Sequence, residues 1–159
     1  MYRVHEPPSA DKLADLALLA DGMNIDLPET PNFTPKQFNL LLEKAPTDAD
    51  RELLQNAILR CQSRANYATE NAGHYGLGLQ RYSHFTSPIR RYSDLLVHRA
   101  LIDACNLGTD GMKQNSAEQI SEICTHISGT EQIAAKAERR TIDRMANINL
   151  EPGSSTKEE

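Results

Sequence analysis

Residues 70–101 read ENAGHYGLGLQRYSHFTSPIRRYSDLLVHRAL, and this segment brings glycines, histidines, aromatic residues and arginines together. In its first part, glycines over residues 73–78 interrupt any helix, while Tyr75, Leu77 and Leu79 alternate along the chain. The alternation predicts a short, buried β-strand with close backbone neighbours. A glycine-rich phosphate loop is the alternative, although the spacing matches neither the dinucleotide fingerprint nor the P-loop.

The second half of the segment predicts a long helix. Ser87 suits the N-cap, Pro88 suits the first helical position, and the helical pattern continues to about Asn106. Free backbone N–H groups and the positive end of the helix dipole would then lie beside Arg90 and Arg91. Phosphate is therefore the natural candidate ligand of this helix start.

Simpler interpretations of the same residues remain open. Arg91 and Asp94 lie one helical turn apart, so they can form an ion pair without any ligand. Asp94 and His98 can form a pair on the helix surface, which we favour, or act as a base and its orienting group.

Three aromatic residues, Tyr82, Phe85 and Tyr92, lie among the arginines. Such rings can stack on the bases of single-stranded nucleic acid. We nevertheless expect at least two of these rings to pack in the core.

Charge is distributed unevenly along this chain of 159 residues, whose formal net charge is −5. Residues 1–59 carry five Lys/Arg against ten Asp/Glu, and residues 102–159 carry six against ten. Residues 60–101 carry six arginines against only Glu70 and Asp94. The acidic balance argues against a general nucleic-acid binder, but the arginine-rich centre suits bidentate contacts with phosphate oxygens. We therefore expect the functional residues in the central segment.

Capping signals upstream of this segment predict three helices, which begin after Ser9, Thr34 and Thr47. The first ends near Asn24 and leads into a connector over residues 26–33. In the second, Gln37 completes a capping box, and the helix stops before Pro46. Apolar residues at helical spacing are expected to face inward: Leu13, Leu16, Ala20, Met23, Phe38, Leu41, Leu42, Leu54, Ile58 and Cys61.

Downstream, a capping box at Ser116 predicts one long helix that reaches about Ala146 and is bent or broken near Gly129. Its core-facing residues are predicted to be Ile120, Cys124, Ile127, Ala134, Ala137 and Met145. The opposite face is charged, which we interpret as a solvated surface. The domain is thus expected over residues 1–146, and residues 147–159 are expected to form a disordered tail.

The composition, with 39% apolar and 25% charged residues, is that of one soluble globular domain. Its apolar runs are too short for a membrane-spanning helix and no signal-peptide pattern is present, so we expect a cytoplasmic protein without membrane contacts. Cys61, Cys105 and Cys124 are odd in number and widely spaced. They predict reduced, mostly buried thiols rather than a disulfide framework or a structural zinc site.

The segment 70–101 closely resembles the late signature of the catalytic domain of the ribonuclease II / ribonuclease R family, the RNB domain. In that family a GHFGLAL-type strand precedes a YAHFTSPIRRYPDLLVHR motif, from which Ser93 is a mild departure. Residues 2–8 resemble the family's YRVHE-P segment, and residues 130–131 with 137–139 resemble its closing helix. The resemblance implies the C-terminal part of an RNB-type catalytic domain. Such a part is a predominantly α-helical α+β fold with about five helices and a short glycine-rich strand.

The resemblance also implies an activity. Members of this family are processive hydrolytic exoribonucleases, which degrade single-stranded RNA from the 3′ end to nucleoside 5′-monophosphates with a divalent metal, usually Mg²⁺. The family pattern assigns a catalytic role to Arg90, which would contact the phosphate near the scissile bond and stabilise its developing charge. Further RNA-binding side chains along the channel would be Tyr82, His84, Thr86, Ser87, Arg91 and Glu138.

One part of the family pattern has no counterpart in this chain. The family's metal ions are held by a D-x-D-D-type aspartate cluster, whereas here the closest pair, Asp48 and Asp50, is explained by its place in the first turn of a predicted helix. We therefore expect no metal ligand from this chain and Mg²⁺ only in the complete family enzyme. Nor do these 159 residues show a counterpart of the family's upstream RNA-binding domains, of the first part of its catalytic domain or of its downstream S1 domain, so we expect the C-terminal portion of a catalytic domain.

Two functions follow from these observations. The chain is expected to be a fragment of a 3′-to-5′ exoribonuclease that is inactive alone and acts on single-stranded RNA with an upstream fragment carrying the aspartate cluster. The alternative is a non-catalytic module that binds RNA or a protein through the region of Arg90. An orphan helical fragment with an exposed core is a third, purely structural interpretation.

Overall fold

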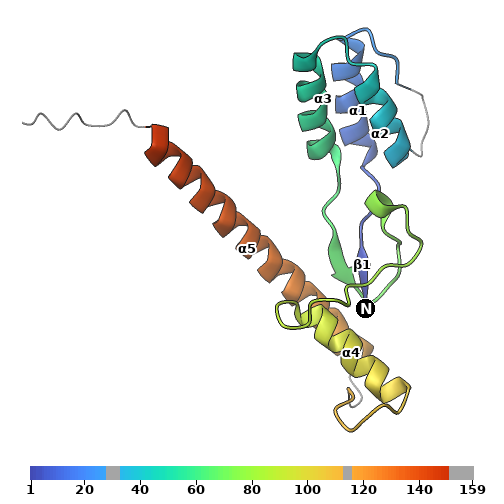
Figure 1. Cartoon of the computed structure of the whole chain (residues 1–159). Coiled ribbons are helices and arrows are strands. Elements are labelled where there is room, and N and C mark those ends of the chain that lie inside the picture. The colour runs from blue at the N-terminus through green and yellow to red at the C-terminus, as the bar shows by residue number, and fades with distance from the viewer. Residues whose placement is uncertain (28–32, 113–115, 151–159) are drawn as a thin grey trace, which may run out of the picture.

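The computed structural model describes residues 1–27, 33–112 and 116–150. Over these residues the chain forms five α-helices and one small antiparallel sheet (Figure 1). A bundle of three helices lies at one end, the sheet lies in the middle, and α4 with the start of α5 lies at the other end. The predicted class, a predominantly helical α+β fold with about five helices, is therefore confirmed.

The bundle consists of α1 (Ala10–Asp21), α2 (Pro35–Glu43) and α3 (Asp48–Cys61). These helices pack around a core that contains most of the inward-facing residues predicted for them: Leu16, Ala20, Phe38, Leu41, Leu54, Ile58 and Cys61. The other predicted members, Leu13, Met23 and Leu42, pack against this core and are partly buried. The predicted helix starts are also confirmed. The backbone N–H of Thr34 donates to Gln37 Oε1 at 2.6 Å, and that of Asp50 donates to Thr47 Oγ1 at 3.1 Å. The first helix ends at Asp21 rather than near Asn24, which adopts a left-handed φ of 58°.

A two-stranded sheet joins the bundle to the rest of the molecule. Strand β1 (Tyr2–Val4) pairs antiparallel with β2 (Asn66–Ala68), with Arg3 opposite Tyr67. Strands of three residues are too short to show apolar alternation, so neither was predicted from the sequence. The sheet places the N-terminal residues beside the segment that follows α3.

The predicted glycine-rich strand is wrong. Tyr75–Leu77 forms a short 3₁₀ turn, and His74 forms isolated bridges to His5 and Leu79. Gly73 and Gly78 have φ values of 74° and 65°, which break an extended strand and fold the segment into a tight loop. The loop lies close to β1, because a Cβ at Gly76 would be only 2.8 Å from His5 Nδ1.

The long central helix begins later than predicted. Helix α4 covers Tyr92–Ala104, so it starts after Arg91 and ends before Asn106. Residues 88–90 form a turn in which the Ser87 carbonyl oxygen accepts from the backbone N–H of Arg90 at 3.3 Å and of Arg91 at 3.0 Å. Arg90 therefore lies on a turn before the helix rather than in its first turn.

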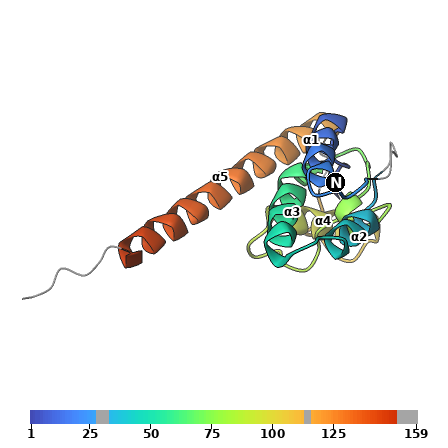
Figure 2. The ribbon, with the colours of Figure 1, turned by 90° about the horizontal axis from the view of Figure 1, so that it is seen from above.

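Helix α5 (Ala117–Leu150) begins at the predicted capping box, in which the Ser116 N–H donates to Gln119 Oε1 at 2.9 Å. It runs unbroken through Gly129. Its buried and half-buried residues lie in its first part, whereas residues 131–147 are all classed as exposed. Figure 2 shows this C-terminal part extending away from the other elements.

The predicted core face of α5 is therefore only partly correct. Cys124 is buried and Ile127 is half-buried, but the later members Ala134, Ala137 and Met145 are exposed, with Met145 at 61%. The helix also continues to Leu150 rather than ending near Ala146.

Two predictions fall partly outside the described residues: the connector over residues 26–33 and the tail over residues 147–159. None of the helices within the described ranges combines the length and the apolar character that a membrane crossing needs. The three cysteines are free, with Cys61 and Cys124 buried as expected and Cys105 exposed.

Candidate functional site

Three of the seven predicted site residues, Arg90, Arg91 and Glu138, line a groove between α5 and the turn before α4. The groove has a volume of about 630 Å³. Its lining consists of Tyr67, Arg90, Arg91, Tyr92, Ser93, Ile127, Thr130, Glu131, Ala134, Ala135 and Glu138. We call it the Arg90 groove. Arg90, Arg91 and Glu138 were predicted from positions far apart in the sequence, and the structure brings them together here.

The two neighbouring arginines of the groove are held differently. Arg91 donates to Asp94 Oδ2 from Nη2 at 2.8 Å and from Nε at 3.2 Å, so the simple ion pair considered from the sequence is present. Arg90 is exposed and forms no ion pair or side-chain hydrogen bond with any residue that the structure describes. The guanidinium of Arg90 is therefore free to meet an anion in the groove.

Asp94 is the buried carboxylate that accepts the hydrogen bonds around this turn. Its side chain is fully buried, and it accepts hydrogen bonds from the Ser87 N–H at 2.7 Å, from Arg91, and from Ser93 Oγ at 3.0 Å. Burial by itself would raise the pKa of Asp94, but the hydrogen bonds from Ser87, Arg91 and Ser93 outweigh burial and hold the pKa below its ordinary value. An ionised Asp94 thus joins the start of the turn to the first turn of α4.

The favoured surface pair between Asp94 and His98 is wrong, and so is its alternative as a base with an orienting group. His98 Nε2 lies 2.7 Å from the Phe85 carbonyl oxygen, to which it donates, and the two rings stack with centroids 4.3 Å apart. Asp94 is occupied by its three other donors. The i, i+4 spacing placed both residues on one helix but did not identify the partner of His98, which lies 13 residues away along the chain.

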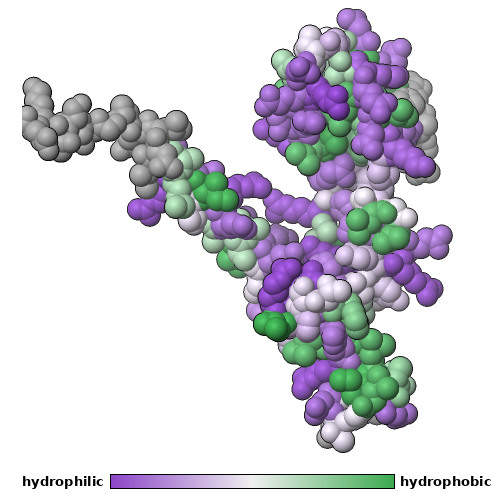
Figure 3. Space-filling model, viewed as in Figure 1, coloured by the Kyte–Doolittle hydropathy of each residue, from purple (hydrophilic) through white to green (hydrophobic). Residues whose placement is uncertain are grey.

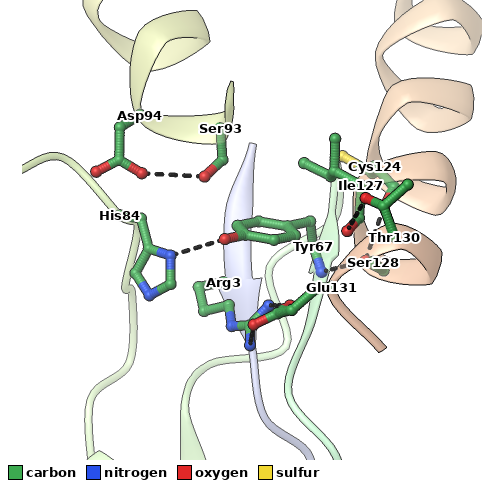
Figure 4. A network of polar contacts seen from close by, with 10 residues as sticks. All are labelled: Arg3, Tyr67, His84, Ser93, Asp94, Cys124, Ile127, Ser128, Thr130 and Glu131. Atoms are coloured by element: carbon green, nitrogen blue, oxygen red, sulfur yellow. Dashed lines mark hydrogen bonds and ion pairs between the residues drawn. The ribbon is translucent and has the colours of Figure 1, made fainter. Parts of the chain in front are cut away.

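His84 and Tyr82 lie beside the groove without lining it. His84 Nδ1 is 2.9 Å from the Tyr67 hydroxyl (Figure 4), and the Tyr82 ring packs edge-on against His74 and His84. Burial, followed by the nearby charges of Arg91 and Arg3, lowers the pKa of His84. Both side chains therefore support the segment that carries the turn.

The remaining predicted contacts are more exposed. Thr86 is exposed and Ser87 is half-buried, and neither lines the Arg90 groove. Phe85 and Tyr92 are about half exposed, so the expectation that at least two of the three aromatic residues pack in the core is wrong. Tyr92 lies in the groove wall, where its ring is open to solvent.

Sequence reasoning missed the network that fixes α5 against the sheet. Arg3 donates to both carboxylate oxygens of Glu131, at 2.6 and 2.8 Å, and its Cζ lies 4.6 Å from the centroid of the Tyr67 ring (Figure 4). The Tyr67 N–H donates to Ser128 Oγ at 2.9 Å. The only sequence signal was the resemblance of residues 2–8 and 130–131 to the family pattern, because the contacts join residues about 60 to 130 positions apart.

No three His, Cys, Asp or Glu side chains within the described ranges lie close enough together to hold a metal ion. Asp48 and Asp50 lie at the start of α3, where Thr47 Oγ1 donates to Asp50 Oδ2 at 2.7 Å. These described side chains do not fit the pair of carboxylate-bound ions that the family resemblance implies.

Comparison with known proteins identifies the relatives of this chain. A family model described as "RNB domain" matches residues 1–106. Ribonuclease R of Aquifex aeolicus is 38% identical over 143 residues, which cover 90% of this chain and 20% of that protein. Ribonuclease R of Escherichia coli is 35% identical over 151 residues, covering 90% of this chain and 19% of that protein. The chain thus spans about a fifth of the length of these curated relatives.

Solved structures agree with this assignment of fold. The apo form of Mycoplasma genitalium RNase R matches with a TM-score of 0.80 at 30% identity, covering 94% of this chain and 24% of that one. The same enzyme in complex with ribose-methylated single-stranded RNA matches with a TM-score of 0.77, at the same identity and coverage. Yeast Ssd1, described as a pseudonuclease, matches with a TM-score of 0.60 at 27% identity, covering 80% of this chain and 16% of that one.

Proposed function

This chain belongs to the RNB domain family, and on that premise we propose that it is part of a 3′-to-5′ hydrolytic exoribonuclease that acts on single-stranded RNA. The product of the reaction is a nucleoside 5′-monophosphate. The RNB relatives are ribonucleases R, and one of the similar structures contains single-stranded RNA. The role of this chain is to hold the phosphate near the scissile bond.

The observation that carries the proposal is the contrast between the two adjacent arginines. Arg91 has a structural role, because it forms an ion pair with the buried Asp94. Arg90 lies on the adjoining turn and lines a groove of about 630 Å³. Its guanidinium forms no ion pair or hydrogen bond with any other described residue. A free, oriented guanidinium beside a phosphate stabilises the negative charge that develops during hydrolysis. Glu138 faces the same groove from α5 and is the candidate contact for the terminal nucleotide.

The metal-binding carboxylates belong, in this proposal, to an upstream fragment of the catalytic domain. In-line hydrolysis with two metals needs several carboxylates that converge on the ions, and the described residues contain no such cluster. We therefore propose that the chain is inactive alone and that Mg²⁺ is held by the aspartates of its partner.

A second function is favoured by the same lack of a ligand cluster among the described residues. The chain would then be a non-catalytic module that binds RNA or a protein through the Arg90 groove. The similarity to a structure described as a pseudonuclease supports this alternative, because it pairs the same fold with that description.

The experiment that separates these functions is a degradation assay on 5′-labelled single-stranded RNA with Mg²⁺. The chain is assayed alone and with an upstream RNB fragment that carries the aspartate cluster. We expect no release of nucleotides by the chain alone and metal-dependent release on mixing. In the mixture, Arg90→Ala should lower the rate by about 10²-fold or more, as the loss of a charge-stabilising donor does, whereas Arg51→Ala on the exposed surface of α3 should not.

Each other result decides against part of this proposal. Release by the chain alone that depends on Arg90 would show that the fragment needs no outside carboxylates. If the mixture releases no nucleotides but RNA still binds through Arg90, the result would favour the non-catalytic module.

A further inference from the structure

A second hollow lies next to the Arg90 groove, around the side of α5. It has a volume of about 280 Å³ and is lined by Arg3, Arg64, Ala65, Glu131, Gln132, Ala135, Lys136 and Arg139. The two hollows share Glu131 and Ala135, so they adjoin along one edge of the helix. We call this second hollow the basic groove.

The basic groove has a strong excess of positive charge. Four of its side chains are cationic and one, Glu131, is a carboxylate, which Arg3 already neutralises by a bidentate pair. The other three cations are Arg64, Lys136 and Arg139. Within the described part of the chain they form no ion pair and no side-chain hydrogen bond. Figure 3 shows hydrophilic side chains gathered where α5 meets the rest of the molecule.

The three cations come from elements that the fold holds together. Arg64 lies in the connector between α3 and β2, whereas Lys136 and Arg139 lie on consecutive turns of α5. The Tyr67 N–H to Ser128 bond and the Arg3–Glu131 pair fix α5 against the sheet on either side. Like charges that are brought close by packing repel one another, and an anion bound between them relieves this repulsion.

The position of the groove identifies the kind of anion. Arginine guanidinium groups match phosphate oxygens, and the small side chains of Ala65 and Ala135 leave room for a ligand to approach closely. A ligand in the basic groove would continue directly from the Arg90 groove along the shared edge. We propose that Arg64, Lys136 and Arg139 bind backbone phosphates of the same RNA strand that reaches Arg90. This inference rests on the proposed function and extends it to a second phosphate-binding site.

The test compares RNA binding by two variants with the same change of charge. The groove variant carries Arg64→Gln, Lys136→Gln and Arg139→Gln. The control variant carries Arg51→Gln, Arg140→Gln and Arg144→Gln, whose side chains are exposed and line neither groove. Binding of labelled oligo(A) of about 12 and about 4 nucleotides is measured by fluorescence anisotropy at several salt concentrations.

We expect the groove variant to bind the longer oligonucleotide roughly tenfold more weakly than the control at low salt. The slope of log K against log salt should fall by about 2, because each lost phosphate contact to a single strand contributes about 0.7. The shorter oligonucleotide, which is held at the Arg90 groove, should bind both variants equally.

Different failures are distinguishable. Equal binding of the longer oligonucleotide by the groove and control variants would contradict phosphate binding in the basic groove. It would not affect the proposed role of Arg90. Inorganic phosphate that competes as well as unlabelled oligo(A), at equal phosphate concentration, would overturn RNA as the ligand. Loss of binding in the groove variant but not in Arg90→Gln would support the basic groove and contradict the proposed function. Thermal melting checks that each variant is folded, and the single change Arg64→Gln replaces the triple variant if that one does not fold.

Discussion

The buried carboxylate of Asp94 explains why two adjacent arginines differ, with Arg91 paired and Arg90 exposed. It is fully buried, and its three donors come from the turn and from the first turn of α4. Because Asp94 fixes Arg91 and the Ser87 N–H, the intervening turn leaves Arg90 exposed at the groove. Asp94 itself does not line the groove, so its effect on a bound anion would come through the position of Arg90.

Removing this carboxylate should destabilise the protein strongly. We expect Asp94→Ala to lower the free energy of unfolding by about 3 kcal/mol, because it leaves Arg91 and the Ser87 N–H without their buried acceptor. Asp94→Asn keeps an acceptor oxygen and should cost less. Urea denaturation measures both, with Asp143→Asn on the exposed part of α5 as the control, which should stay within about 0.5 kcal/mol. Equal midpoints for Asp94→Ala and the control would show that Asp94 does not hold the turn.

Two histidines beside the site should make the stability depend on pH. The pKa of His74 is lowered by burial and then by the charges of His5 and Arg3, and the pKa of His84 is lowered by burial and then by Arg91 and Arg3. Both therefore stay neutral in the folded state at a pH where the unfolded chain, with a histidine pKa of about 6.5, already binds protons. The free energy of unfolding should consequently fall as the pH drops from about 7 to about 5.

The measurement for this dependence is urea denaturation across that pH range. The double variant His74→Gln and His84→Gln should flatten the profile, whereas His126→Gln, whose side chain is exposed, should leave it unchanged. A profile that keeps its slope in the double variant would assign the dependence to other groups.

Among the elements, the helices of the bundle and the long helix α5 behave differently. The bundle helices bury their apolar stripes against one another. Helix α5 buries its stripe only as far as Cys124 and Ile127, although the pattern continues to Met145. The pattern of an amphipathic helix indicates which face is apolar, but it cannot indicate whether another element is present to cover that face.

In the loop over residues 73–79, glycine conformation prevents the strand that the alternating apolar pattern predicts. Leu77 and Leu79 alternate as they would in a strand, yet both are exposed. Gly73 and Gly78 take left-handed φ values that a strand cannot contain. The result is a tight loop that packs on His5 and supports the segment leading to Arg90.

Many large apolar side chains are exposed among the described residues of this molecule. Ile89 is fully exposed beside Arg90, and large apolar side chains are also exposed on α4, after it and along α5: Tyr92, Leu95, Leu101, Leu107, Ile133, Ile142 and Met145. Figure 3 shows hydrophobic surface over the α4 end of the molecule and along α5. Contiguous apolar surface of this kind promotes association.

We therefore expect the isolated chain to self-associate at micromolar concentrations. Analytical ultracentrifugation should show species heavier than 17.7 kDa, and Ile142→Gln with Met145→Gln should shift the distribution toward the monomer. Leu18→Gln, at a still more exposed position on α1, serves as the control and should have less effect. A purely monomeric wild-type chain would contradict the prediction.

Local sequence was enough to predict those features that depend on neighbours within one or two helical turns. The caps at Thr34, Thr47 and Ser116 are of this kind, because their hydrogen bonds span only three residues. The Arg91–Asp94 pair spans three residues as well. The family resemblance rested on an equally local motif, and it selected Arg90 without any knowledge of its partners.

The arrangement of the site depends instead on contacts between distant residues. The Arg3–Glu131 pair spans 128 positions and the Tyr67–Ser128 bond spans 61. These contacts bring Glu138 to the same groove as Arg90, and Arg64 to the same hollow as Lys136 and Arg139. The energy of such contacts arises only when the chain has folded, since bringing the partners together costs entropy that no local pattern records. The free Arg90, the anchored Arg91 and the two adjoining grooves were therefore visible only in the folded molecule.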